Sequence, residues 1–435
     1  MKKLVAALTA LILMIFFAAT AIHAAPPEIS SQAAILIDPQ TGSVLFGQNA
    51  HERLPPASLT KIMTAILAIE LGNLDDLAIV NETALEGFPP NASLLGLLVG
   101  EEMRLGDLIS ATMLMSGNDA ANAIAEHISR DIPTFVEMMN SRAAELGAFN
   151  TNFTNATGLH DDEHLSTVYD MAIISRHAMT IPEFRAIVVN AHLYLDETNL
   201  FEERRYIVNT NNMISRFRTT AYYFAPTIGI KTGFTSYAGS CLAAAAGRGR
   251  PFELITVTFG AEREDGRNQS FVDTRALFDF GYDNFRQVHI TRFGQILGEV
   301  PIRYARGTNS LSLAASEPIT VLIPREADIA NVERRAILPD YIIAPIERGQ
   351  RIGEMEFLYN GNVIGRVDLL SNSSETRQTF WFISMSLNFI WSFLAVRIIA
   401  YVLLAAFVLW LLLMFIGIRR AIKRSKNRER YIRRR

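Results

Sequence analysis

Residues 398–418 form an unbroken apolar run of 21 residues without one charged side chain. A helix needs about 20 apolar residues to cross the hydrocarbon core of a bilayer, so this run predicts a transmembrane helix. The rest of the chain must therefore fold in a way that suits attachment to a membrane near its C-terminal end.

The segment after this run, residues 419–435, holds ten Lys or Arg residues against one Glu, a net charge of +9. By the positive-inside rule this basic tail is predicted to stay in the cytoplasm, with the body of the chain outside. The whole chain carries −3, so residues 1–418 carry −12. An acidic exported body argues against nucleic acid as a partner.

The N-terminus has the pattern of a secretory signal peptide over residues 1–24. Lys2 and Lys3 precede an apolar stretch over 4–22, and the small residue Ala24 stands just before Ala25 and the prolines. This order of basic, apolar and small residues predicts cleavage near Ala24. An uncleaved anchor helix is the alternative, because the run is close to the lower length limit for spanning.

The single cysteine, Cys241, excludes an intrachain disulfide. It stands in the small apolar run 239–246, where a free cysteine behaves as a buried hydrophobe and makes a poor nucleophile. No group of His, Cys or acidic residues has the spacing of metal ligands. The sequence therefore predicts neither a metal nor another cofactor.

A chain of 435 residues is long enough for at least two folded units. Hydrophobic periodicity and turn signals predict these elements before residue 285: a hairpin over 33–46, a helix over 58–71, a mostly helical stretch over 105–179 with breaks at 116–118 and 155–158, strands over 228–230, 239–246 and 252–259, and a helix over 270–280. Strands at both ends with helices between them predict one sheet, assembled from distant parts and packed by helices, in a domain over 25–285.

Beyond this domain the pattern changes to short alternating strands, which predicts a small β-rich domain over 286–372. Asn360 and Gly361, between two alternating runs, are a strong hairpin signal. Residues 373–397 are predicted to be a linker and an amphipathic segment in the membrane interface, because Ser384, Asn388 and Ser392 recur at four-residue spacing. A simple extension of the membrane span remains the alternative.

Three short motifs carry the chemistry. In chain order they are Ser58-Leu59-Thr60-Lys61 (S-x-x-K), Ser116-Gly117-Asn118 (S-x-N) and Lys231-Thr232-Gly233 (K-T-G). Each is common alone, as a capped helix start, a polar turn between helices and the end of a strand. Together, in this order and in these settings, they fit one mechanism.

A serine hydroxyl is a weak nucleophile unless a base takes its proton. Lys61 shares a helix face with Ser58 and can be that base if its amine is neutral, which requires lowering a pKa of about 10.4. Burial or a nearby positive charge lowers a lysine pKa, and Lys231 could supply that charge. Ser116 would relay a proton to the departing amine, while Asn118 would hold the peptide by hydrogen bonding.

The three motifs are the signature of penicillin-binding proteins and serine β-lactamases. The chain resembles the low-molecular-mass penicillin-binding proteins that act as D-alanyl-D-alanine carboxypeptidases. The likeness covers about residues 33–284, including Gly158-Leu159, residues 164–167 and Asp170, and continues more weakly to the C-terminal anchor. It implies an α+β fold: a penicillin-binding/serine β-lactamase-like domain, with an antiparallel sheet packed by helices, then a small all-β domain and a C-terminal transmembrane helix.

The resemblance also implies a function and partners. Such an enzyme removes the terminal D-alanine from peptidoglycan stem peptides that end in D-Ala-D-Ala, through an acyl-enzyme on Ser58. β-Lactam antibiotics acylate the same serine. The expected partners are therefore these peptides, β-lactams and the cytoplasmic membrane, which the C-terminal helix would enter.

In the family's pattern, Lys231 and Thr232 of the K-T-G strand, with Gly233, face the free carboxylate of the substrate, and a basic residue after the following strands assists. Arg267 is the match for that residue, and Arg263 is its competitor. A solvated charge is the alternative for both, because they lie in a charged stretch.

The resemblance assigns the oxyanion donors to the backbone N–H groups of Ser58 and Phe234. Many relatives place His, Thr or Tyr after K-T-G, so Phe234 is a variation. Only the main-chain N–H is needed at that place, so the variation bears on substrate preference and not on the oxyanion hole.

Two other functions compete with this reading. A β-lactamase would need a carboxylate that activates water, and no convincing Glu-x-x-Leu-Asn segment stands between the second and third motifs. A non-catalytic wall-binding protein of the same fold is disfavoured because Ser58, Lys61, Ser116 and Lys231 are all present.

Overall fold

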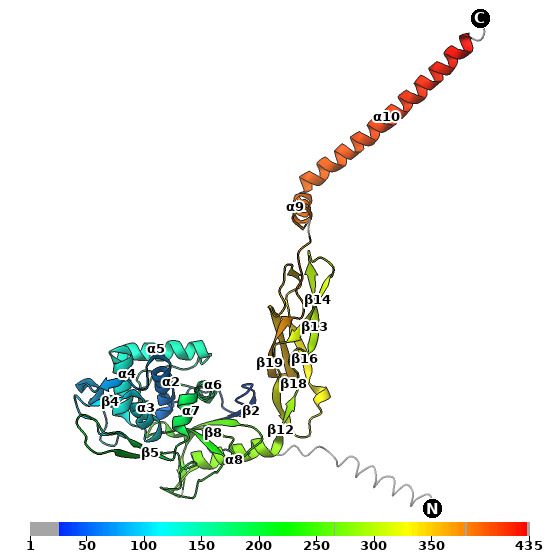
Figure 1. Ribbon diagram of the computed structural model, residues 1–435. Coiled ribbons are helices and arrows are strands. Elements are labelled where there is room, and N and C mark those ends of the chain that lie inside the picture. The colour runs from blue at the N-terminus through cyan, green and yellow to red at the C-terminus, as the bar shows by residue number, and fades with distance from the viewer. Residues whose placement is uncertain (1–25, 265, 379–380, 433–435) are drawn as a thin grey trace, which may run out of the picture. The chain divides into compact units, whose positions relative to one another are not determined.

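The computed structural model describes residues 26–264, 266–378 and 381–432 (Figure 1). The predicted signal peptide over 1–24 lies outside the described residues. The chain forms two compact units. Among the described residues, the first unit holds those up to Phe293 together with Glu317–Ala336 and Glu354–Val367, and the second unit holds Gly294–Ser316, Ile337–Gly353 and those from Asp368 onward.

The first unit is built on a five-stranded antiparallel sheet in the order β2-β1-β9-β8-β7. Its strands are β1 (Ala33–Ile37), β2 (Val44–Gln48), β7 (Thr227–Thr235), β8 (Gly239–Ala246) and β9 (Leu254–Ala261). Strand β1 pairs with β9 in a register that sets Ala33 opposite Phe259. The first and last segments of the domain are thus neighbours, which confirms the predicted sheet assembled from distant parts.

Helices cover both faces of this sheet, and the alternation of side chains explains why. In β1, Ile35 and Ile37 enter the larger core, while Ala34 and Leu36 enter the core on the other face. Both faces are apolar, as expected for strands buried on two sides. The larger core includes residues of α2 (Lys61–Leu71) and α6 (Val168–Ala178), and the second core is formed with α8 (Gln269–Asn284).

The helices between β2 and β7 largely follow the predicted pattern. They are η1 (Ala57–Thr60), α2 (Lys61–Leu71), η2 (Glu82–Leu85), α3 (Leu105–Leu114), α4 (Asn118–Ser129), α5 (Ile132–Leu146), α6 (Val168–Ala178) and α7 (Pro182–Val188). The Thr167 side chain caps α6 by accepting the N–H of Asp170 at 2.9 Å. The helix expected from Ser58 begins instead as a 3₁₀ turn, and the α-helix starts at Lys61.

Short antiparallel ribbons complete the part of this unit that precedes residue 285. They pair β3 (Leu77–Ile79) with β4 (Glu102–Arg104), β5 (His192–Leu195) with β6 (Arg205–Val208), and β10 (Arg263–Glu264) with β11 (Arg267–Asn268).

Further on, β12 (Phe285–His289) pairs with β15 (Thr320–Pro324), and η3 (Ile329–Asn331), β16 (Glu333–Ile337), β18 (Arg351–Tyr359) and β19 (Asn362–Ser371) follow. Asn360 and Gly361 between β18 and β19 both have positive φ, 50° and 80°, as the hairpin signal predicted.

In the second unit, β14 (Ser310–Ala315) pairs antiparallel with β13 (Ile296–Arg303) and with the end of β19, while β13 pairs in parallel with β17 (Ile342–Ile343). Two helices follow, α9 (Trp381–Ser392) and α10 (Leu394–Ile432). Within α10, residues Val396–Arg424 are long and apolar enough to cross a membrane. This helix is consistent with attachment of the protein to a membrane.

Candidate active site

The S-x-x-K motif lies where η1 passes into α2. Ser58 is half-buried on the 3₁₀ turn, and Lys61, the first residue of α2, has no exposed surface. The three-residue spacing sets both side chains on one face, with 3.1 Å between Lys61 Nζ and Ser58 Oγ. The amine is thus within proton-transfer distance of the hydroxyl.

Two further acceptors fix the Lys61 amine. Its Nζ donates to Asn118 Oδ1 at 2.7 Å and to the backbone carbonyl of Thr157 at 2.5 Å. A neutral amine has two N–H bonds and one lone pair. With both N–H bonds directed at Asn118 and Thr157, the lone pair is left for the Ser58 hydroxyl.

The electrostatic setting favours this neutral form. Burial lowers the pKa of Lys61 well below its ordinary value, and the positive charge of Lys231 lowers it further, while the carboxylate of Asp119 opposes the shift. Both causes expected from the sequence, burial and the Lys231 charge, act in the structure.

The S-x-N motif lies in the turn between α3 and α4. Ser116 is buried with a φ of 67°, an unusual backbone conformation for a residue other than glycine. Asn118 begins α4, and its backbone N–H and its Nδ2 both donate to the carbonyl of Ser93, at 2.8 and 3.1 Å. The amide of Asn118 is therefore held in one orientation, with Oδ1 turned to Lys61.

The K-T-G motif lies on the edge strand β7. Lys231 is buried, its Nζ donates to the carbonyl of Thr232 at 2.9 Å, and burial lowers its pKa to about 7. The hydroxyl of Thr232 lies 2.6 Å from that of Thr210. This contact ties the strand to the segment that follows β6.

Gly233 lets the strand approach the nucleophile's own backbone. A Cβ at this position would lie 3.1 Å from both the backbone nitrogen of Ser58 and the Cβ of Ala57. Such a contact is tighter than most real Cβ contacts, so glycine permits the close approach. The structure thus brings the first and third motifs together across this contact, and Lys61 joins the first motif to the second.

The residues beyond K-T-G lie at the surface. Phe234 has 52% of its surface exposed, and the Arg263 guanidinium lies over its ring, 4.7 Å from the centroid. Arg267 is an exposed residue of β11, set opposite Glu264 in the β10–β11 ribbon. Of the two arginines considered from sequence, Arg263 is the one that contacts the residue after K-T-G.

Sequence reasoning missed three residues of this cluster: Thr157, Thr210 and Ser93. Thr157 and Ser93 act through backbone carbonyls, which every residue has, so their residue types give no signal in the sequence. Thr210 contributes a hydroxyl from a segment 22 residues before its partner in the K-T-G motif. The only available signal was the loop prediction over 155–158, which contains Thr157.

Cys241 is buried in β8, and burial raises the pKa of its thiol to about 12. The thiol therefore stays protonated at neutral pH. This agrees with the prediction that Cys241 is a small core residue and not a nucleophile.

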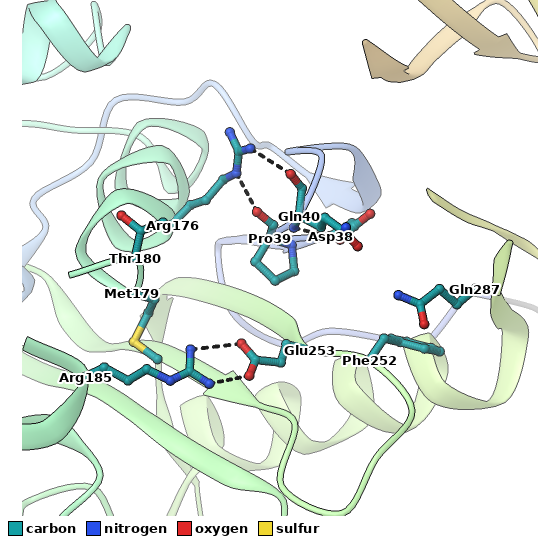
Figure 2. A pocket seen from close by; sticks show the side chains of 10 residues that line it. All are labelled: Asp38, Pro39, Gln40, Arg176, Met179, Thr180, Arg185, Phe252, Glu253 and Gln287. Atoms are coloured by element: carbon teal, nitrogen blue, oxygen red, sulfur yellow. Dashed lines mark hydrogen bonds and ion pairs between the residues drawn. The ribbon is translucent and has the colours of Figure 1, made fainter. Parts of the chain in front are cut away.

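A cavity of about 380 Å³ lies elsewhere in the first unit (Figure 2). Its charged groups already have partners: Arg185 pairs with Glu253, Arg176 donates to the carbonyls of Pro39 and Gln40, and Asp38 accepts the backbone N–H of Gln40. None of its lining residues belongs to the three motifs. The paired charges indicate a structural hollow, so the chemistry is assigned to the Ser58 cluster.

The site combines a half-buried serine, a buried lysine of lowered pKa, and a strand whose glycine lies against the backbone nitrogen of the serine. These features define the class of serine acyl-transfer enzymes in which lysine is the base. Comparison with known proteins makes the class specific. Residues 20–263 match the family model described as D-alanyl-D-alanine carboxypeptidase, and residues 285–377 match the C-terminal domain of penicillin-binding protein 5.

Relatives and solved structures agree with these models. The chain is 32% identical to the D-alanyl-D-alanine carboxypeptidase DacF of Bacillus subtilis, over 84% of this chain and 92% of that protein. It is 31% identical to DacA of Haemophilus influenzae, over 79% and 85%. The crystal structure of penicillin-binding protein 5 from Haemophilus influenzae aligns with a TM-score of 0.66 and 30% identity, covering 81% of this chain and 99% of that one.

The chain therefore belongs to the D-alanyl-D-alanine carboxypeptidase family of serine peptidases. Its fold is the α+β penicillin-binding protein fold, a catalytic domain followed by a C-terminal all-β domain, as the resemblance implied. Peptidoglycan substrates and β-lactam binding are typical of this family.

Proposed function

We propose that this protein is a serine-type D-Ala-D-Ala carboxypeptidase that removes the terminal D-alanine from peptidoglycan stem peptides through an acyl-enzyme on Ser58. One observation carries the proposal. The buried Lys61 amine contacts Ser58 at 3.1 Å, while its other partners, Asn118 and Thr157, accept its hydrogen atoms. This arrangement supports Lys61 as the base that activates Ser58.

The first half of the reaction forms the acyl-enzyme. Lys61 takes the hydroxyl proton of Ser58 as Oγ attacks the carbonyl carbon of the penultimate D-alanine. The backbone N–H groups of Ser58 and Phe234 stabilise the negative oxygen of the tetrahedral intermediate. When this intermediate collapses, the peptide C–N bond breaks, and Ser116 passes the proton held by Lys61 to the departing amine.

The second half of the reaction releases the shortened peptide. D-alanine leaves, and a water molecule attacks the ester carbonyl while Lys61 accepts one of its protons. The same donors stabilise the second tetrahedral intermediate. The C–O bond to Ser58 then breaks, the proton returns to Oγ, and the peptide leaves with a new carboxylate.

Recognition of the leaving D-alanine is assigned to the K-T-G strand. Lys231 and Thr232 would bind the free carboxylate, with Asn118 holding the peptide. Arg267 is our candidate for the assisting cation by its place in the family pattern. Arg263 stays the competitor, supported by its stacking on Phe234 beside the motif.

The competing functions have less support. A β-lactamase would need a carboxylate to activate the deacylating water, and no convincing Glu-x-x-Leu-Asn segment stands between the second and third motifs. A non-catalytic protein would have no need for a buried lysine of lowered pKa, which is costly to keep in a core.

Release of D-alanine tests the proposal directly. The full-length protein in detergent micelles is incubated with a peptide ending in D-Ala-D-Ala, and free D-alanine is measured. We expect release by the wild type and none by Ser58→Ala. A wild type that releases no D-alanine would overturn the assignment, and release by Ser58→Ala would overturn the nucleophile.

We also propose the domain boundaries that the sequence indicates. They are a signal peptide over 1–24, a catalytic domain over 25–285, a β-rich domain over 286–372, a linker and interfacial segment over 373–397, a transmembrane helix over 398–418 and a basic tail over 419–435. The two family matches, over 20–263 and 285–377, support the division between the catalytic and β-rich domains.

The orientation in the membrane is a prediction from the charge step after residue 418. The basic tail should be cytoplasmic, and the body should lie outside. Protease added to intact protoplasts should therefore degrade the body but spare an epitope tag placed after Arg435. Loss of the tag under the same treatment would contradict this orientation.

The exposed ring of Phe234 leads to a prediction about the oxyanion hole. Phe234→Ala keeps the backbone N–H and should retain the rate of D-alanine release within about tenfold. Phe234→Pro removes that donor and should lose roughly a hundredfold or more. Comparable rates in the two variants would refute a role for this N–H group.

A further inference from the structure

A chain of three hydrogen bonds runs from a backbone N–H through a buried histidine and a threonine to the residue before the nucleophile. The backbone N–H of Thr154 donates to His164 Nδ1 at 2.9 Å, and His164 Nε2 lies 2.7 Å from Thr60 Oγ1. Thr60 Oγ1 in turn donates to the carbonyl of Ala57 at 2.8 Å. His164, Thr60 and Ala57 are at most 2% exposed, so water does not compete for these bonds.

The directions of these bonds follow from one fixed donor. A backbone N–H can only donate, so His164 Nδ1 must be the acceptor and the proton of the neutral ring is on Nε2. Nε2–H then donates to Thr60 Oγ1, and the Thr60 hydroxyl has its own proton for Ala57. Burial lowers the pKa of His164 to about 4, so the ring is neutral near pH 7.

The Ala57 carbonyl at the end of these hydrogen bonds is closely surrounded by other atoms. Ala57 has a φ of 48°, a strained conformation for a residue with a side chain. Gly158 lies against this carbonyl: a Cβ at Gly158 would be 1.9 Å from the Ala57 oxygen and 2.8 Å from Thr60 Oγ1. The surroundings therefore hold the peptide unit in one orientation.

This peptide unit is the one that carries the N–H of Ser58. A trans peptide is planar, and its C=O and N–H point in opposite directions. Fixing the oxygen of Ala57 therefore fixes the direction of the Ser58 N–H. On the other side of the unit, the strand at Gly233 lies against the Ser58 nitrogen.

We propose that Thr60 and His164 are positioning residues for the oxyanion hole: they hold the Ala57 carbonyl so that the Ser58 N–H points at the oxygen of the tetrahedral intermediate. Neither residue touches the substrate. The inference rests on the proposed function, since it needs Ser58 to be the nucleophile. It assigns to Thr60 a task separate from that of its neighbour Lys61.

Substitutions at Thr60 separate this role from simple packing. Thr60→Val keeps the shape but loses the hydroxyl, whereas Thr60→Ser keeps the hydroxyl. The readout is the affinity for a peptide boronic acid, which forms a reversible tetrahedral adduct with a serine oxygen. Affinity for the shortened product peptide, which forms no such adduct, is measured beside it.

We expect Thr60→Val to bind the boronic acid about ten- to a hundredfold more weakly and to lose kcat for D-alanine release to a similar extent. Product affinity and KM should change less than threefold, and Thr60→Ser should stay near the wild type. Equal losses in boronic acid and product binding, or a Thr60→Val protein that matches the wild type, would overturn the proposal.

A pair of variants tests His164 in the same assays. Gln can reach Thr60 with an amide N–H in place of Nε2–H, whereas Leu offers no donor. His164→Gln should therefore keep more boronic acid affinity and kcat than His164→Leu, with both variants compared at a temperature where thermal unfolding shows them folded. Equal losses would overturn the role of His164. A wild type that releases no D-alanine and forms no boronic acid adduct would overturn the proposed function and this inference together.

Discussion

Penicillin added to the wild-type protein is expected to form one covalent adduct on Ser58 that persists for minutes or longer. A penicillin presents a strained amide beside a carboxylate, as a D-Ala-D-Ala terminus does. Lys231 and Thr232 should therefore orient it for attack, and Lys61, 3.1 Å from Ser58, is placed to take the hydroxyl proton. Opening of the ring leaves an ester on Ser58.

The persistence of the adduct follows from the fate of the leaving group. After attack on a peptide, D-alanine diffuses away and water can reach the ester. The opened antibiotic stays tethered where that water must enter. The sequence between the second and third motifs has no convincing Glu-x-x-Leu-Asn segment that would supply a water-activating carboxylate to compensate for the blocked approach. Hydrolysis should therefore be slow relative to acylation.

Intact-protein mass spectrometry measures this directly. The wild type should gain the mass of one penicillin, and Ser58→Ala should gain none. Cys241 serves as an internal control, because its buried thiol of raised pKa should stay unmodified. An adduct mapped to another residue would refute the nucleophile, and turnover of penicillin within seconds would refute the carboxypeptidase assignment in favour of a lactamase.

The secondary-structure elements and the three motifs could be predicted from the sequence, because both have local signals. The apolar run of β1, the apolar spacing in α2 and the Asn360-Gly361 turn all depend on neighbours within a few residues. The helix expected from Ser58 is present, but its first turn is 3₁₀. Ala57 takes a positive φ within that turn and lies close to Gly158 and Gly233, and no local pattern predicts these contacts.

The contacts that orient the cluster could not be predicted, because they join segments that are distant in the sequence, and some of them end on backbone groups that every residue has. The carbonyl of Thr157 lies 96 positions from Lys61, and His164 lies 104 positions from Thr60. A backbone carbonyl has no sequence signature. The burial of Lys61 was foreseeable only as a requirement of its chemistry, because lysine is rarely buried without a reason.

The burial of Lys61 leads to the second prediction. Lys61→Met keeps an unbranched side chain of similar length but has no base, so both acylation by penicillin and release of D-alanine should fall roughly 10²- to 10⁴-fold. Lys61→Arg should be no better, because a guanidinium stays protonated. Stopped-flow or quenched acylation assays measure the loss, and a variant that retains more than about a tenth of the wild-type rate would refute Lys61 as the base.

The pH dependence of the acylation rate in the wild type tests the same role, because the direction of the change shows which protonation state of Lys61 is active. Acylation needs neutral Lys61, so the rate should rise with pH as Lys61 loses its proton, and the lowered pKa places this rise well below the pH at which an ordinary lysine loses its proton. The positive charge of Lys231 contributes to that lowering. Lys231→Met removes the charge and should raise the pKa of Lys61, which moves the rise to higher pH. Lys231→Arg keeps a positive charge and should not move the rise to higher pH. The rates are compared at saturating penicillin, so that a loss of affinity for the carboxylate does not enter the comparison. A rise that stays at the same pH in Lys231→Met would show that burial alone sets the pKa of the base.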